Sequence, residues 1–167
     1  EWLRKGLSNM LGVNREKFIV APPQRKMTKI VPDEIRKGCF MFFYASTPDC
    51  HKNFETLCEA AQYLEEELGP GVFKVVLTVK GHENRYASWL YKRWGELDSI
   101  EFAGFMSKSR LYGYYEAADC FVFPSKVETW GLPITEFMDT GKPMILADLP
   151  YAHETAAGSK KTVFFRT

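Results

Sequence analysis

The sequence predicts an α/β protein built on a Rossmann-like parallel sheet with helices on both faces. Two observations predict this fold class. From residue 39 onward, short apolar segments alternate with segments whose apolar residues recur at helical spacing. The apolar segments are nearly continuous, which is typical of parallel strands covered on both faces. The length of 167 residues, 46% of them hydrophobic, is sufficient for one domain with a sizeable core.

The first 38 residues lie outside this alternation. Residues 1–12 carry apolar side chains at helical spacing, and Gly12 is expected to end that helix. Residues 18–21 predict a short strand, which the following pair of prolines would end. Residues 24–38 are polar and basic and contain Pro32, so we interpret them as a linker or an exposed excursion.

The rest of the chain predicts strands and helices in alternating order. The expected strands cover residues 39–45, 73–79, 100–103, 120–124, 143–147 and 163–165. The expected helices cover residues 53–68, 84–94, 107–118 and 131–140, followed by a short helix after Pro150. In that short helix we expect Glu154 to act as a cap or an interdomain contact rather than as a catalytic group. Because open parallel sheets bind ligands beyond the carboxyl ends of their strands, the loops that follow the strands are the places to search.

Composition and missing motifs exclude several classes of protein. The 22 basic and 21 acidic residues give a formal net charge of +1, which leaves no electrostatic footprint for nucleic acid. The longest apolar run, residues 39–45, is far shorter than the ~20 residues of a membrane-spanning helix. The sequence contains no Gly-x-Gly-x-x-Gly, Walker, Gly-x-Ser-x-Gly or Asp-x-Asp motif. We therefore expect no dinucleotide cofactor, P-loop, serine-hydrolase triad or bound metal.

The ends and the cysteines suggest a cellular context. The charged, amphipathic start does not resemble a signal peptide, and the missing initiator Met suggests a fragment of a longer protein. The four cysteines lie mainly in apolar surroundings, which favours free thiols in a reducing compartment. We expect a cytoplasmic location.

The loop after the first apolar strand is the first candidate site. Residues 46–54 open the first long helix, where backbone N–H groups and the helix dipole favour an anion. Lys52 adds a full positive charge at the same place. The alternative is that Lys52 is a solvated surface lysine and that Asp49 or Asn53 merely caps the helix.

The loop after residues 120–124 is the second candidate. Gly131 lets the backbone approach a ligand, Pro133 is tolerated in a first helical turn, and the N–H groups around them could hold an anion. Glu128 precedes the helix and Glu136 lies within it; carboxylates of this kind bind vicinal sugar hydroxyls well. The alternative is one solvated glutamate and one on a helix surface.

These pieces occur in an order that resembles a known family. Residues 102–147 resemble the C-terminal, donor-binding domain of GT-B fold glycosyltransferases, specifically the retaining family 4. The matching pieces are the segments 102–105 and 118–125, the Glu-x7-Glu element at Glu128 and Glu136, and Gly141-Lys142-Pro143. The resemblance extends over about residues 39–165. It implies that residues 1–38 are the end of an N-terminal domain and an interdomain segment. Residues 39–167 would then be one nucleotide-sugar-binding domain, truncated at its C-terminal end.

The resemblance also implies roles for the charged residues. Lys52 would neutralise the diphosphate and Glu128 would contact the transferred sugar, which makes these two the expected catalytic residues. Glu136 would hold the ribose hydroxyls of the nucleotide. In place of an arginine that the family usually has six residues before this lysine, the chain has Ser46, which could donate one hydrogen bond but brings no charge.

Other implied contacts involve less polar residues. The backbone around Gly131 and Leu132, with Pro133 beside it, would touch the sugar and the phosphate. Phe105 and Met106 would flank the nucleobase, partly through backbone groups.

The implied activity is transfer of a sugar from a nucleotide diphosphate sugar to an acceptor hydroxyl, with retention of configuration, in polysaccharide or glycoconjugate synthesis. The implied partners are the nucleotide sugar donor, a sugar or lipid-linked sugar acceptor and the protein's own N-terminal domain, through which the full protein could also associate with a membrane. No cofactor or metal would be required. Two alternatives stay open: a GT-B sugar epimerase or phosphorylase, and a non-catalytic nucleotide-binding or regulatory domain.

Overall fold

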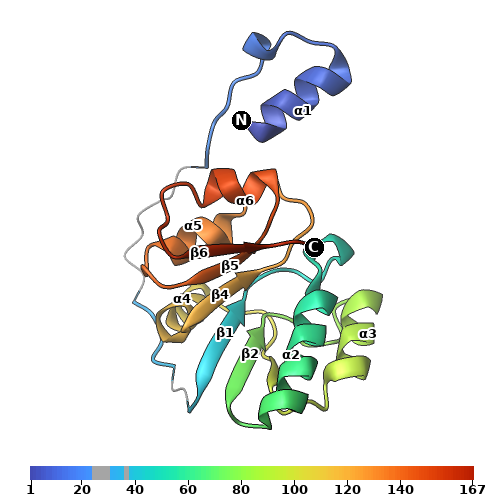
Figure 1. Ribbon diagram of the computed structural model, residues 1–167, viewed down its shortest axis with the longest axis vertical. Helices are drawn as coiled ribbons and strands as arrows, with labels where there is room; N and C mark the ends of the chain where they lie inside the picture. Colours follow the sequence, from blue (N-terminus) through green and yellow to red (C-terminus); the bar gives the residue numbers. More distant parts are fainter. Residues whose placement is uncertain (24–30, 36–37) are drawn as a thin grey trace.

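The computed structural model describes residues 1–23, 31–35 and 38–167, and most of the expected linker, residues 24–30 and 36–37, lies outside these ranges. Its centre is a six-stranded parallel sheet in the order β3-β2-β1-β4-β5-β6 (Figure 1). This confirms the predicted fold class. The strands are β1 (Phe40–Tyr44), β2 (Phe73–Leu77), β3 (Ile100–Phe102), β4 (Cys120–Phe123), β5 (Met144–Ala147) and β6 (Thr162–Phe165).

The helices connect the strands as the sequence pattern predicts. They are α2 (Phe54–Leu68), α3 (Arg85–Trp94), α4 (Lys108–Ala117), α5 (Leu132–Met138) and α6 (Pro150–Thr155). Local chemistry sets several ends: the side chain of Asn84 accepts a hydrogen bond from the N–H of Ala87 at the start of α3, and Gly69, with φ of 83°, follows the last residue of α2.

Aromatic side chains attach the helices to the two faces of the sheet. On one face, Tyr44 of β1 packs against Phe54 of α2, with ring centroids 4.5 Å apart. On the other face, Phe43 stacks on Tyr114 of α4 at 5.2 Å, and Phe121 stacks on Phe137 of α5 at 4.9 Å. Neighbouring residues of a strand point to opposite faces, so Phe43 and Tyr44 join the two helical layers through one core.

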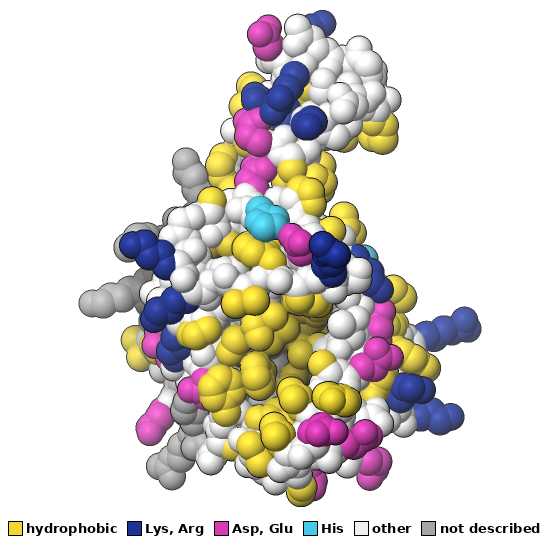
Figure 2. Space-filling view, viewed as in Figure 1, with side chains coloured by type: hydrophobic (Ala, Val, Ile, Leu, Met, Phe, Trp, Pro, Cys, Tyr) yellow, Lys and Arg dark blue, Asp and Glu magenta, His cyan; other side chains and the backbone are white. Residues whose placement is uncertain are grey.

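Part of the α2 face of the sheet is open. Figure 2 shows apolar side chains gathered on this face beside α2. They line a groove of about 240 Å³ between the flank of α2 and the strands, with Phe42, Val122, Ile145 and Phe165 as its floor and Ala60 and Leu64 on its side. The order of the chain explains this: α2 and α3 cover β1 to β3, whereas α4, α5 and α6 follow on the opposite face.

The N-terminal segment lies beyond the carboxyl ends of the strands (Figure 1). It contains α1 (Trp2–Leu11), which ends at Gly12 as predicted, and the 3-10 turn η1 (Arg15–Lys17). Glu154 of α6 accepts a hydrogen bond of 2.8 Å from the backbone N–H of Trp2, so this carboxylate contacts the N-terminal segment. None of the helices among the described residues is long and apolar enough to cross a membrane.

One predicted element is wrong. Residues 18–21 form no strand, and Ile19 is 93% exposed. Their apolar, β-branched composition favours an extended backbone, but a strand also needs a partner. The two edges of the described sheet are β3 and β6, and neither pairs with this segment.

Candidate functional site

The candidate site lies where the strand order reverses. β1 and β4 are neighbours in the sheet, although about 80 residues separate them, and the helices that follow them, α2 and α5, leave toward opposite faces. Such a reversal opens a crevice beyond the carboxyl ends of the two strands. The two segments selected from the sequence, residues 46–54 and 124–136, follow β1 and β4 at this reversal point.

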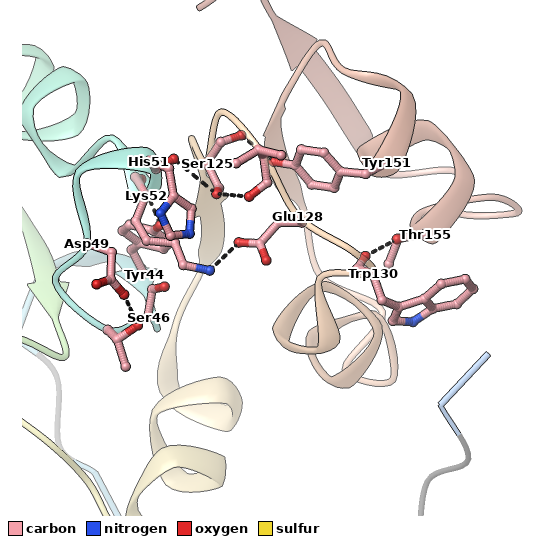
Figure 3. A network of polar contacts seen from close by, with 12 residues as sticks. Tyr44, Ser46, Asp49, His51, Lys52, Ser125, Glu128, Trp130, Tyr151 and Thr155 are labelled. Carbon is pink, nitrogen blue, oxygen red and sulfur yellow. Dashed lines mark hydrogen bonds and ion pairs between the residues drawn. The ribbon is translucent and has the colours of Figure 1, made fainter. Parts of the chain in front are cut away.

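The structure brings Lys52 and Glu128 together in this crevice (Figure 3). The Nζ of Lys52 lies 2.6 Å from Oε1 of Glu128, and the two side chains are only 14% and 13% exposed. A charge-assisted hydrogen bond of this length between two largely buried groups is a strong contact. The alternative interpretation of both residues as solvated surface groups is therefore wrong.

Backbone groups join the two loops behind this ion pair. The carbonyl oxygen of His51 accepts hydrogen bonds from the N–H of Lys126 at 2.7 Å and from the hydroxyl of Ser125 at 3.3 Å. The side-chain amide of Asn53 donates to the carbonyl oxygen of Pro124 at 3.1 Å. Lys52 and Glu128 consequently project from a connected main-chain framework.

Two buried tyrosines also hold the main chain of these two loops in place. Tyr44 donates to the carbonyl oxygen of Lys52 at 2.8 Å, and Tyr151 donates to that of Ser125 at 2.6 Å (Figure 3). Burial raises the pKa of Tyr44 and of Tyr151 well above that of a free phenol, and the nearby charge of Glu128 raises the pKa of both further. Both hydroxyls therefore remain protonated donors.

Asn53 is a residue whose importance the sequence analysis missed. It is 1% exposed, and its φ of 57° makes it the only non-glycine residue with a positive φ in the described part of the chain. Its side chain does not cap α2; instead its oxygen accepts a hydrogen bond from the hydroxyl of Thr56 at 2.8 Å. Asp49 does not cap the helix either, because its carboxylate accepts from the hydroxyl of Thr47. The signal available in the sequence was an asparagine, which tolerates the left-handed conformation, between Lys52 and a helix.

Ser46 lies at the junction of two strand ends. Its N–H donates to the hydroxyl oxygen of Thr78, and that hydroxyl donates to the Ser46 carbonyl oxygen, both at 2.8 Å. Its main chain is thereby fixed to the end of β2. Lys52 remains the charged group of this loop that faces Glu128.

Glu136 lies on α5 and is half-buried. One of its oxygens accepts a hydrogen bond of 3.1 Å from the hydroxyl of Tyr115, which comes from α4. Burial, together with the charge of Glu136, raises the pKa of Tyr115 well above its usual value, so the Tyr115 hydroxyl remains a protonated donor. The other Glu136 oxygen has no such protein donor among the contacts of the described residues.

A larger cavity continues the crevice toward the N-terminal segment. It has a volume of about 660 Å³ and is lined on one side by residues 128–133 and on the other by Trp2, Phe18 and their neighbours. Gly131 adopts φ of 86°, Leu132 is 46% exposed, and Pro133 lies in the first turn of α5. The hydroxyl of Thr155 donates to the carbonyl oxygen of Trp130 and fixes this loop against α6.

Phe105 and Met106 differ in their surroundings. Phe105 is 93% exposed at the carboxyl end of β3, whereas Met106 is only 7% exposed and belongs to the core. Of the two side chains, only that of Phe105 is free to stack on a ligand, and Met106 could contribute only its backbone.

Lys142 of the Gly-Lys-Pro element has a structural role. Its ammonium group donates to the carbonyl oxygens of Ala118, at 2.9 Å, and of Glu116. These are carbonyls at the C-terminal end of α4, where a cation also favours the helix dipole.

An all-parallel sheet with helices on both faces and a reversal of strand order between β1 and β4 defines a Rossmann-like domain. Residues 27–166 match the family model described as glycosyl transferases group 1. The chain belongs to this family, and the predicted resemblance to GT-B glycosyltransferases is confirmed. No group of three His, Cys, Asp or Glu residues in the described ranges is arranged to hold a metal ion.

Two known proteins match parts of this chain in sequence. The O-antigen chain mannosyltransferase B of Escherichia coli is 30% identical over 106 residues, covering 64% of this chain and 28% of that protein. The alpha-monoglucosyldiacylglycerol synthase of Streptococcus pneumoniae is 36% identical over 104 residues, covering 60% of this chain and 22% of that protein. The chain thus spans about a quarter of these curated relatives.

Solved structures share the fold. The GtfA/B complex matches with a TM-score of 0.64 and 23% identity, over 81% of this chain and 26% of that one. Anabaena Alr3699/HepE in complex with UDP and glucose matches with a TM-score of 0.60 and 22% identity, over 76% of this chain and 34% of that one.

Proposed function

We propose that this chain is the donor-binding domain of a retaining, family 4 glycosyltransferase that binds a nucleotide diphosphate sugar. The observation that carries the proposal is the pairing of Lys52 with Glu128 at the reversal point of the sheet. The relatives support a sugar-transfer reaction, because two of them are named as a mannosyltransferase and a glycolipid synthase. The complex of a structural neighbour with UDP and glucose supports a nucleotide sugar as the ligand.

The difficult step of such a reaction is departure of the nucleotide diphosphate. Negative charge grows on the leaving oxygen, and a preorganised positive group beside it lowers the barrier. Lys52 supplies that charge, and the hydrogen bond from the Tyr44 hydroxyl to the Lys52 carbonyl oxygen fixes the main chain that carries it. We expect no metal requirement, because the lysine performs the neutralisation that a metal would otherwise perform.

The carboxylates have separate tasks in this proposal. Glu136, held through one oxygen by Tyr115, presents the other to the ribose hydroxyls. Glu128 contacts the sugar, and the backbone from Gly131 to Pro133 approaches the sugar and phosphate. Phe105 flanks the base at the edge of the crevice.

The acceptor enters from the side of the N-terminal segment, where the 660 Å³ cavity opens. We expect residues 1–38 to belong to the end of an N-terminal domain and its connection, so that the full protein would close over the acceptor and exclude water. The acceptor would be a sugar or a lipid-linked sugar.

Titration of UDP and GDP into the wild-type chain and Lys52→Ala tests the charge role. We expect a loss of affinity of about tenfold or more, since a charge-assisted contact is removed. Lys92→Ala, which removes an exposed lysine from α3, is the matched control and should bind as the wild type does. Equal affinities for wild type and Lys52→Ala would refute the assignment.

A further inference from the structure

The Lys52–Glu128 pair has a consequence for which ligands the crevice accepts. Without a ligand, the positive group proposed for the diphosphate is already occupied by a carboxylate 2.6 Å away. The two opposite charges cancel, and both side chains are more than four-fifths buried. The ammonium group keeps further N–H donors, but its charge is already offset, so an incoming diphosphate must compete with Glu128 for the charge of Lys52.

The framework around the pair restricts how this competition can be resolved. The Lys52 carbonyl is held by Tyr44, and the loop that carries Glu128 is held by Ser125, whose hydroxyl donates to the carbonyl oxygen of Val127 at 3.1 Å. Because the main chains are fixed on both sides, the adjustment falls on rotation of the Lys52 and Glu128 side chains. A rotated carboxylate stays close to the diphosphate, and like charges in a poorly solvated crevice repel strongly.

The chemistry of the ligand decides whether this repulsion is compensated. A sugar attached to the diphosphate brings hydroxyl groups that can donate hydrogen bonds to the displaced carboxylate, which is an acceptor only. A nucleotide diphosphate without its sugar brings additional negative charge and no such donor. A displaced carboxylate without a partner weakens binding of the bare nucleotide, because an unpaired charge in a partly buried site is unfavourable.

We propose that Glu128 is a specificity-determining residue that discriminates the nucleotide sugar from the bare nucleotide diphosphate by competing for Lys52. The inference rests on the proposed function and deepens it: the same pair that receives the donor helps to expel the product. No covalent step is involved.

The test compares two affinities in each protein. Dissociation constants for UDP and UDP-glucose, and for GDP and GDP-mannose, are measured by calorimetry on the 167-residue chain and on Glu128→Gln. The substitution keeps the size and an acceptor oxygen but removes the charge. We expect Glu128→Gln to bind the bare nucleotide at least fivefold more tightly and the nucleotide sugar no more tightly than the wild type does.

Glu55→Gln is the matched control, because Glu55 also pairs with a lysine of the opposite loop, Lys126 at 3.2 Å. Its removal should leave the ratio of the two affinities unchanged. Glu128→Ala is the second variant and should also strengthen binding of the bare nucleotide, with thermal unfolding used to verify that each variant is folded.

The outcomes separate this inference from the proposed function. If the wild type binds nucleotides and the ratio is the same in Glu128→Gln, Glu128→Ala and wild type, the competition is refuted while donor binding stands. If the wild type binds neither the nucleotides nor the nucleotide sugars, the proposed function fails and the inference falls with it.

Discussion

The side-chain amide of Asn53 donates a hydrogen bond of 3.1 Å to the carbonyl oxygen of Pro124, so one buried residue joins the loops after β1 and β4. Asn53→Ala removes this bond. It also places alanine at φ of 57°, and the alanine side chain cannot form the local hydrogen bonds that make this conformation tolerable for asparagine. We expect it to lower the free energy of unfolding by about 2–3 kcal/mol, from a lost buried hydrogen bond and left-handed strain. Urea unfolding measures the change.

Asn53→Gly separates the two contributions. Glycine adopts the left-handed conformation without strain, so only the hydrogen bonds are lost, and the expected change is about 1 kcal/mol. Equal losses for the glycine and alanine variants would show that the conformation of the backbone is unimportant here.

Lys142 should stabilise the fold without affecting the ligand. Lys142→Met keeps much of the aliphatic stem but removes the donor to the α4 carbonyls, and we expect a loss of about 1–2 kcal/mol in the free energy of unfolding. Lys161→Met, an exposed lysine before β6, is the control. A Lys142→Met protein of unchanged stability, or one with reduced UDP affinity at full stability, would contradict the structural role.

Three of the four cysteines should react in two groups. Cys50 is exposed, whereas burial raises the pKa of the Cys58 thiol to about 12 and that of Cys120 to about 11, with nearby carboxylates adding to both shifts. The thiolate is the reactive form, so Cys50 should be modified by a disulfide reagent in the native protein and Cys58 and Cys120 only after unfolding. The folded Cys50→Ser variant should therefore lack the fast phase of thiol modification. A fast phase that persists in this variant and maps to Cys58 would contradict the burial.

Glu83 should make stability depend on acidic pH. Partial burial opposes its charge, but hydrogen bonds from the N–H groups of Lys80, Gly81 and His82 outweigh this effect and lower its pKa. A carboxyl whose pKa is lower in the folded state adds stability above its unfolded pKa of about 4.3, and this stability is lost as pH falls through the folded pKa. Glu83→Gln should therefore lose less stability than the wild type between pH 6 and pH 3.

The control for this experiment is Glu67→Gln, at the exposed end of α2. Its stability should fall with pH as steeply as that of the wild type. If the stability of Glu83→Gln also falls with pH as steeply as that of the wild type, the three backbone N–H groups do not stabilise the charged carboxylate of Glu83.

Tyr115 should act on nucleotide affinity through Glu136. Tyr115→Phe removes the hydroxyl that holds one carboxylate oxygen, and under the proposed function we expect UDP to bind several-fold more weakly, because Glu136 loses its fixed orientation. The effect should be smaller for 2′-deoxy-UDP, which lacks one of the ribose hydroxyls. An equal loss for both nucleotides would place the contribution of Tyr115 elsewhere.

The sequence predicted the features that depend on a local pattern, either the spacing of apolar residues along a segment or the position of a residue in a loop. Nearly continuous apolar runs predicted the six strands of the sheet, and the rule that open parallel sheets bind ligands beyond the carboxyl ends of their strands selected the loops of Lys52 and Glu128. The pairing of the two side chains with each other was not predicted, because a distance between residues 76 positions apart depends on packing.

The missed features depend on distant partners. The amide of Asn53 and the ammonium group of Lys142 act on backbone carbonyls of other elements, and no local pattern identifies such acceptors. Residues 18–21 have strand-like composition but no strand beside them, and Met106 is buried by core neighbours that its loop position does not reveal. The roles of the site residues toward a ligand stay predictions.

The contacts that join the two loops, and those that hold each loop in place, terminate largely on main-chain carbonyls, those of His51, Pro124, Ser125 and Lys52. Carbonyl groups are present whatever side chain a position carries. Outward-facing positions such as His51 can therefore change during evolution, or in a designed library, while the spacing of the charged pair is retained. New specificity can be selected at the rim without rebuilding the scaffold beneath it.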